Sequence, residues 1–354
     1  MKCIEALVSY QWTDSSDAER LHEELALRGF LVHHDRCSFE TGGRLPAQMA
    51  VAVERSDVVV ALLTKHSLYL GAPAGSPRPA LDAEFIPSMQ RRRTHLAELG
   101  VNPLSSVKAR PVVIPVLRGL GDPHGEGSEL VRQHTGENIG SLWMPAVTQD
   151  GELPLSDAQS IARGALGAVI DSALGEPIVL QVVTRGSGEA PITGLNVDAT
   201  SLLGGRDRRV GAPLDWDRLL GSFRDVRDTL GHSTRCRSLE LAPKCHLAAA
   251  VALGRVFSQS TGWKISIPSR QGLVDSVSQP AGAELAMSWE SEASTGDIAV
   301  QVDLLGHPVF DMARRATIDW PQPPLGRLQV SRHDSRHEMT PEDVMFAARK
   351  VADE

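Results

Sequence analysis

An almost unbroken apolar run, Asp57-Val58-Val59-Val60-Ala61-Leu62-Leu63, constrains the fold of this chain more than any other stretch. A strand with one face in water alternates apolar and polar residues, and this run does not. It is typical of a central strand in a parallel sheet that is covered on both faces. Further strands are expected at residues 4–10, 30–32 and 111–117, with Pro115 placing the last one at an edge of the sheet or near a strand end.

Helical segments separate these strands. Leu21 and Leu25 lie on one apolar stripe that follows the helix-start residues 14–17, and Gly29 is expected to end that helix. Pro46 can open the next helix, and a later helix is expected to contain Glu84, with Pro87 kinking it or ending it early. The alternation of strand and helix predicts an open, mostly parallel α/β sheet.

Functional groups of such sheets gather at the carboxyl ends of the strands. Ser9, Tyr10, Asp35, Arg36 and the loop before Glu84 all fall at that end. Each also has a purely structural interpretation. Ser9 and Tyr10 can simply end a strand, Asp35 and Arg36 can form a solvated ion pair, and Glu84 can complement a helix dipole.

The 354 residues favour two domains, which we place at residues 1–150 and 176–354, joined by a helix or linker at 151–175. The net charge of −8 argues against a general DNA-binding surface. Four cysteines without a C-x-x-C pair fit a reducing cytoplasm and predict no structural metal. No secretion signal or membrane span is expected. Residues 121–140 are interpreted as a loop or insertion, and the spacing of Ser156 and Gln159 as a capping box.

The second domain contains two strand–loop–helix–strand units, which suggests two Rossmann-like halves packed together. A helix N-terminus beside a strand end is a ready site for an anion. The expected strands include 178–183, 238–241, 264–267, 297–305 and 327–330. The candidate anion-binding residues lie in loops after strands and in a short basic run: Lys244, Cys245 and His246; Leu305, Gly306 and His307; Arg206, Arg208 and Arg209. The basic run alone is equally typical of a solvated loop.

Several segments of the first domain, in this order and spacing, resemble a TIR domain, whose fold is a flavodoxin-like parallel sheet. They are Leu7-Val8-Ser9-Tyr10 with Asp14, residues 35–52, residues 57–63, and Ile114-Pro115-Val116-Leu117. Glu84 falls where enzymatic TIR domains carry their catalytic glutamate. Many bacterial TIR enzymes have Trp four residues earlier, where this chain has Ala80.

The resemblance implies hydrolysis of NAD⁺ at the bond between nicotinamide and ribose. Nicotinamide leaves from a cationic ring and needs no general acid, so one carboxylate suffices to orient the ribose and stabilise an oxocarbenium-like state. Glu84 takes that catalytic role by resemblance. Ser9, Tyr10, Asp35, Arg36, Gly42 and Gly43 are the candidate substrate contacts. NAD⁺ is then the substrate, and no cofactor is expected.

The second domain resembles a SAVED domain, a cyclic-oligonucleotide sensor made of two fused CARF-like halves. The matching stretches are residues 239–267, including 249–255, and residues 295–300. The resemblance implies that the loop and basic residues named above bind cyclic tri-adenylate or a relative.

A TIR–SAVED fusion implies an antiphage effector of the CBASS type. Ligand binding would drive head-to-tail assembly into a filament and complete a composite active site, with Glu84 from one molecule and the loop around Gly42 and Gly43 from its neighbour. The alternatives are a non-enzymatic TIR scaffold that recruits another protein and a ring nuclease that cuts its own ligand.

Overall fold

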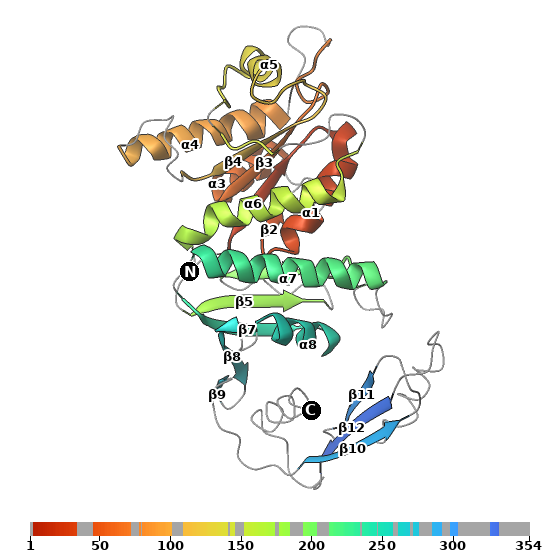
Figure 1. The fold of residues 1–354 in the computed structure, drawn as a ribbon. Coiled ribbons are helices and arrows are strands. Elements are labelled where there is room, and N and C mark those ends of the chain that lie inside the picture. The colour runs from red at the N-terminus through yellow and green to blue at the C-terminus, as the bar shows by residue number, and fades with distance from the viewer. Residues whose placement is uncertain are drawn as a thin grey trace. The chain divides into compact units, whose positions relative to one another are not determined.

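The structure is a computed structural model (Figure 1). It describes residues 3–33, 45–71, 78, 80–100, 109–140, 142–145, 152–173, 177–184, 194–203, 212–233, 236–245, 247–257, 261–269, 272–275, 285–291, 298–303 and 326–332. The chain divides into two compact units, Met1–Trp263 and Lys264–Glu354. The predicted boundary after residue 175 falls inside the first unit.

The first sheet of unit 1 is parallel throughout and has the strand order β2-β1-β3-β4. The strands are β1 (Glu5–Ser9), β2 (Leu31–His33), β3 (Val58–Leu63) and β4 (Val112–Leu117). Every residue of β3 is buried, as its apolar run predicts. Pro115 lies in β4, an edge strand of this sheet, so its expected edge position is confirmed. The predicted parallel α/β fold class is confirmed.

The helices of this part of the chain lie between and after the strands: η1 (Trp12–Asp14), α1 (Ser15–Ala26), α3 (Leu45–Arg55), η2 (Leu81–Phe85), α4 (Ile86–Glu98), α5 (Glu126–Thr135) and α6 (Leu155–Ala173). Helix α5 corrects the interpretation of residues 121–140 as a loop. It buries Val131 and ends at Gly136, whose φ of 75° is the left-handed conformation that glycine tolerates.

The predicted capping box is also wrong. Helix α6 begins at Leu155, so Ser156 lies within its first turn, and the Ser156 hydroxyl lies 3.4 Å from Asp157 Oδ1. The first turn closes instead on the Pro154 carbonyl, which accepts from the amides of Asp157 and Ala158 at 3.1 Å.

Pro87 does not end the helix that contains Glu84. Residues Leu81–Phe85 form a π-helical turn in which the amide of Ile86 donates to the carbonyl of Leu81, five residues back, and α4 then continues to Glu98. Pro87 has no amide to donate to the carbonyl four residues before it, so a local change of helical winding accommodates it.

A second parallel sheet of unit 1 contains β6 (Leu195–Asp198), β5 (Ile178–Val183) and β7 (Ser238–Lys244), with β5 in the middle. Helices α7 (Pro213–Ser233) and α8 (Leu247–Val256) accompany it. Helix α6 packs on both α1 and α7, and Figure 1 shows α6 and α7 side by side. These helices therefore join the two sheets of unit 1.

Unit 2 contains an antiparallel pair, β8 (Lys264–Ser269) with β9 (Gly272–Asp275). It also contains a three-stranded sheet of order β10-β12-β11, formed by β10 (Leu285–Ser291), β12 (Gly326–Arg332) and β11 (Ile298–Asp303). Strand β12 is parallel to β11 and antiparallel to β10. The helix of the second predicted strand–loop–helix–strand unit lies outside the described residues.

Among the described helices, we find none with a stretch of apolar residues sufficient to span a bilayer.

Candidate functional site

Glu84 lies in the η2 turn, where its neighbours fix its position. Leu81 and Phe85 are fully buried in the cluster that includes Leu63 and Leu117, so two residues of the turn anchor it to the first sheet. The Ser88 hydroxyl donates to the Glu84 carbonyl at 2.6 Å. Glu84 itself is 5% exposed. The candidate catalytic carboxylate therefore lies on a turn anchored to the first sheet, and it is nearly closed to solvent.

Ser9 is brought to the start of the same turn. It is the last residue of β1 and is buried, and its hydroxyl donates to the carbonyl of Ala80 at 3.2 Å. Ala80 directly precedes η2, and β1 contacts η2. The structure therefore joins the end of β1 to the segment that carries Glu84, as expected from their common position at the carboxyl edge. Tyr10 follows Ser9 and is also buried.

Two polar contacts at this edge were missed from the sequence. The Gln11 amide Nε2 donates to the Tyr69 hydroxyl at 3.1 Å, and Thr64 Oγ1 donates to Asp14 Oδ2 at 2.8 Å. Both join the segment after β1 to the segment after β3. The position of Gln11 and Tyr69 after apolar strands was the available signal.

The other predicted substrate contacts lie outside the described residues. They are Asp35, Arg36, Gly42 and Gly43. Their approach to Glu84 stays a prediction.

Arg78, which precedes η2, links that turn to helix α5. Its Nη2 lies 2.9 Å from Asp82 Oδ1, and its Nη1 donates to the His134 carbonyl at 2.6 Å near the end of α5. Helix α5 lies close to Leu117 of β4, and this requires glycine at position 127. A Cβ there would lie only 2.8 Å from Leu117 Cδ2. The turn that carries Glu84 is thus linked to α5 as well as to β1.

The candidate residues of the second site are only partly described. Lys244 is the last residue of β7, paired in register with Val183, which corrects its predicted place in the following loop. Cys245 follows and is half-buried. Arg206, Arg208, Arg209, His246, Leu305, Gly306 and His307 lie outside the described residues. Within the described ranges, no three histidine, cysteine or acidic side chains gather as a metal site would require.

A surface pocket of about 420 Å³ lies elsewhere, lined by Arg91, Thr94, His95, Glu98 and Arg110. Burial lowers the pKa of Arg91, whose Nη1 donates to the carbonyls of Val53 and Ser56. Arg110 precedes β4, so the pocket lies at the amino ends of the strands. It is therefore separate from the edge that carries Ser9 and Glu84.

Residues 7–125 match the family model described as TIR domain. The chain thus carries a TIR domain at its N-terminal end, with the sheet order described above. A search of curated proteins found no match.

Three solved structures are similar to most of the chain at low sequence identity. Two are Acinetobacter baumannii Cap4, a SAVED/CARF-domain containing receptor, with the cyclic trinucleotides 2′3′3′-cAAA and 3′3′3′-cAAA. They are 14% and 15% identical with TM-scores of 0.39 and 0.40, and cover 76% of this chain and 73% and 72% of theirs. The third is the Cap4 receptor of Moraxella osloensis, 14% identical with a TM-score of 0.37, covering 97% of this chain and 86% of its own.

Proposed function

We propose that this protein is an NAD⁺ hydrolase that a cyclic oligonucleotide switches on, with Glu84 as its catalytic residue. The observation that carries the enzymatic half is the TIR domain at residues 7–125, in which Glu84 lies on a turn anchored to the end of β1. The reaction consumes water and releases nicotinamide, ADP-ribose and a proton.

One carboxylate is sufficient for this chemistry. The positive charge of the nicotinamide ring makes it a good leaving group, and the bonding electrons leave with it. The Glu84 carboxylate stabilises the positive charge that develops on the ribose and orients the sugar hydroxyls. Water then attacks the anomeric carbon.

The burial of Glu84 supports the gating half of the proposal. A carboxylate that is 5% exposed cannot meet the ribose of a dinucleotide until the groups around it rearrange. Assembly of several copies, with a neighbour's loop around Gly42 and Gly43 completing the site, would supply that rearrangement. The proposed outcome is a homo-oligomeric filament that depletes cytoplasmic NAD⁺ during phage infection.

The ligand of the sensor is cyclic tri-adenylate or a relative. This half of the proposal rests on the resemblance of residues 239–267 and 295–300 to a SAVED domain. The proposed binding residues are Lys244, at the end of β7, with Cys245 and His246, and also Leu305, Gly306, His307, Arg206 and Arg208.

The test is NAD⁺ loss by purified protein with a panel of cyclic di-, tri- and tetranucleotides, with particle size followed in parallel. We expect one ligand to trigger both cleavage and growth in size. Glu84→Gln should lower the cleavage rate by about 100-fold or more, since it removes the charge that stabilises the transition state. It should leave ligand binding and assembly unchanged.

Glu129→Gln is the matched control, because Glu129 is an exposed carboxylate on α5, and it should retain full activity. Equal turnover by Glu84→Gln would contradict the catalytic assignment. Assembly of the wild type without NAD⁺ loss would favour the scaffold alternative, which the presence of Ala80 in place of tryptophan also favours.

A further inference from the structure

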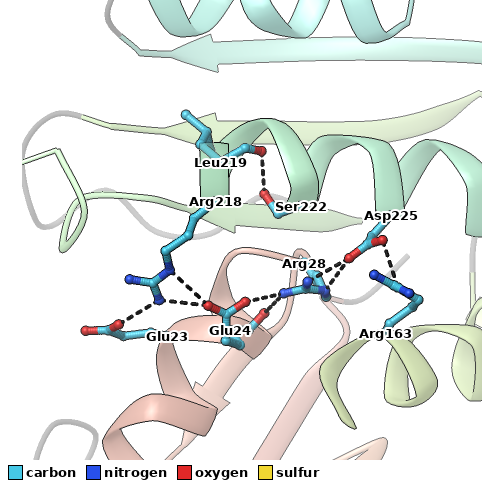
Figure 2. Close-up of polar contacts among 8 residues, drawn as sticks. All are labelled: Glu23, Glu24, Arg28, Arg163, Arg218, Leu219, Ser222 and Asp225. Carbon is cyan, nitrogen blue, oxygen red and sulfur yellow. Dashed lines mark hydrogen bonds and ion pairs between the residues drawn. The ribbon is translucent and has the colours of Figure 1, made fainter. Parts of the chain in front are cut away.

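Six charged side chains link three helices of unit 1, and Figure 2 shows them as one continuous chain of contacts. Three are acids and three are bases, so the cluster buries no net charge. Glu23 and Glu24 belong to α1, Arg28 to the turn after it, Arg163 to α6, and Arg218 and Asp225 to α7. Helix α1 belongs to the TIR domain, whereas α7 accompanies the second sheet.

Arg28 is the central group of this cluster. Its Nη1 donates to Glu24 Oε2 at 2.6 Å, and its Nη2 and Nε donate to Asp225 Oδ2 at 2.6 and 3.1 Å. The side chains of Arg28 and Glu24 are 2% and 1% exposed. A guanidinium so deeply buried is stable only while both of its carboxylate partners stay in place.

The two ends of the cluster extend the same pattern. Arg218 donates to Glu24 Oε1 from Nη2 at 2.7 Å and from Nε at 3.2 Å, and to Glu23 Oε2 at 3.1 Å. Burial lowers the pKa of Arg218, but its hydrogen bonds to Glu24 and Glu23 outweigh that effect, so its pKa is raised. Arg163 Nε lies 2.8 Å from Asp225 Oδ1.

The spacing of these residues fixes one register between the helices. Arg218 and Asp225 are seven residues apart and therefore lie on one face of α7, two turns from each other. Glu24 and Arg28 are four residues apart, so each α7 group meets its own partner. A shift of α7 along α1 by one turn would break both pairs and leave buried charges without partners.

The backbone adds a second, independent attachment. The Gly29 carbonyl accepts from the amide of Asn196, in β6, at 2.9 Å. Gly29 has a φ of 94°, and a Cβ on it would lie 3.0 Å from Leu195 Cβ. Only glycine fits this approach, so the end of α1 is fixed to the second sheet as well as to α7.

We propose that this charge cluster couples the sensor to the TIR domain by holding α1, α6 and α7 in a single register. A buried ion-pair network adds little stability over apolar packing but can specify one arrangement. Ligand-induced movement of the second sheet then carries the TIR domain with it as one body, and α1 does not slide on α7. The reaction and the ligand rest on the proposed function, whereas the rigidity of this block does not.

The test replaces the central pair with apolar residues of similar size, Arg28→Met with Asp225→Leu, in the full chain. Glu24 keeps Arg218, and Arg163 is 59% exposed, so no buried charge loses its last partner. The variant should therefore fold with a Tm close to that of the wild type. We expect amide exchange in residues 24–28 and 218–226 to become about tenfold faster, while exchange in β3 is unchanged.

The same variant should bind 3′3′3′ cyclic tri-adenylate as tightly as the wild type. It should hydrolyse NAD⁺ about tenfold more slowly at saturating ligand, because a TIR domain that has lost the Arg28–Asp225 link to α7 is held less tightly and reaches its neighbour out of register. The control is Arg227→Gln with Asp228→Asn, an exposed pair on the same helix, which should behave as wild type. Full ligand-triggered NAD⁺ loss with unchanged exchange would overturn the coupling role. If the wild type itself cleaves no NAD⁺ with any ligand, the proposed function fails, and the exchange measurement alone decides whether the block is rigid.

Discussion

At the scale of single residues, the Ser9 hydroxyl is the group that joins the central sheet to the turn carrying Glu84. Its bond to the Ala80 carbonyl is buried, and Ala80 is the residue from which η2 departs. The position of the turn that carries Glu84 therefore depends in part on a hydrogen bond from β1.

We predict that Ser9→Ala lowers the free energy of unfolding by about 1 kcal/mol, because a buried carbonyl loses its donor. It should also lower ligand-triggered NAD⁺ hydrolysis several-fold, since η2 loses an attachment. Thermal unfolding and steady-state kinetics measure the two effects.

Ser56→Ala is the control for Ser9→Ala. The Ser56 hydroxyl is buried and donates to the Ala52 carbonyl at 2.6 Å, at the end of α3. A similar loss of stability without a loss of activity is expected there. If both variants lose activity equally, the effect of Ser9 is one of stability alone.

At the scale of elements, the π-helical turn is the feature that places Glu84. A π turn holds one more residue than the α-helical turn it replaces, and one residue corresponds to about 100° of rotation around a helix axis. The winding before Pro87 therefore decides the direction in which the Glu84 side chain leaves the helix.

Pro87→Ala restores an amide that can donate four residues back, to the carbonyl of Ala83, and should favour α-helical winding through residues 81–85. We predict an unchanged or higher Tm and NAD⁺ hydrolysis reduced about tenfold, because the carboxylate is displaced from the reacting ribose. Pro213→Ala, at the first position of α7, should leave activity unchanged. Undiminished activity in Pro87→Ala would show that the π turn is dispensable.

Among the strands and helices, some could be predicted from the sequence and others could not. The strands at 58–63 and 178–183 were predicted correctly from their apolar runs. A strand that is covered on both faces needs consecutive apolar residues, and such a run is visible in the sequence. Strand β6 was missed because its four residues form a strand only by pairing with β5. Helix α5 was missed because it is mostly polar and is flanked by Gly125 and Gly136, a composition that resembles a loop, and because its position depends on contact with Leu117.

The residues of the candidate site also divide into those that the sequence could place and those that it could not. Ser9 and Glu84 were placed at one edge because strand polarity alone requires it. The contact of Gln11 with Tyr69 was not predicted. Tyr69 has a φ of 55°, a backbone conformation that no sequence pattern indicates for tyrosine. The charge cluster around Arg28 was missed because its central pair, Arg28 and Asp225, lies 197 positions apart in the sequence.

At the scale of the whole molecule, the first compact unit extends well beyond the end of the TIR match. The TIR match ends at residue 125, but the first compact unit continues to Trp263 because α6 and α7 pack onto it in sequence. The predicted domain at 1–150 with its connecting segment to 175 therefore excludes α7, which supplies Arg218 and Asp225 to the buried cluster.

This difference predicts how fragments of the chain behave. A fragment of residues 1–263 keeps every member of the cluster and should unfold in one cooperative transition. A fragment of residues 1–175 keeps Glu24 and Arg28 but lacks both α7 partners, and it exposes the face of α6 that packs on α7. It should unfold at a Tm at least several degrees lower and associate in solution, because exposed apolar faces aggregate. Calorimetry and light scattering on the two fragments measure this. A fragment of residues 1–175 as stable and monomeric as the longer one would show that the TIR domain is independent of α7.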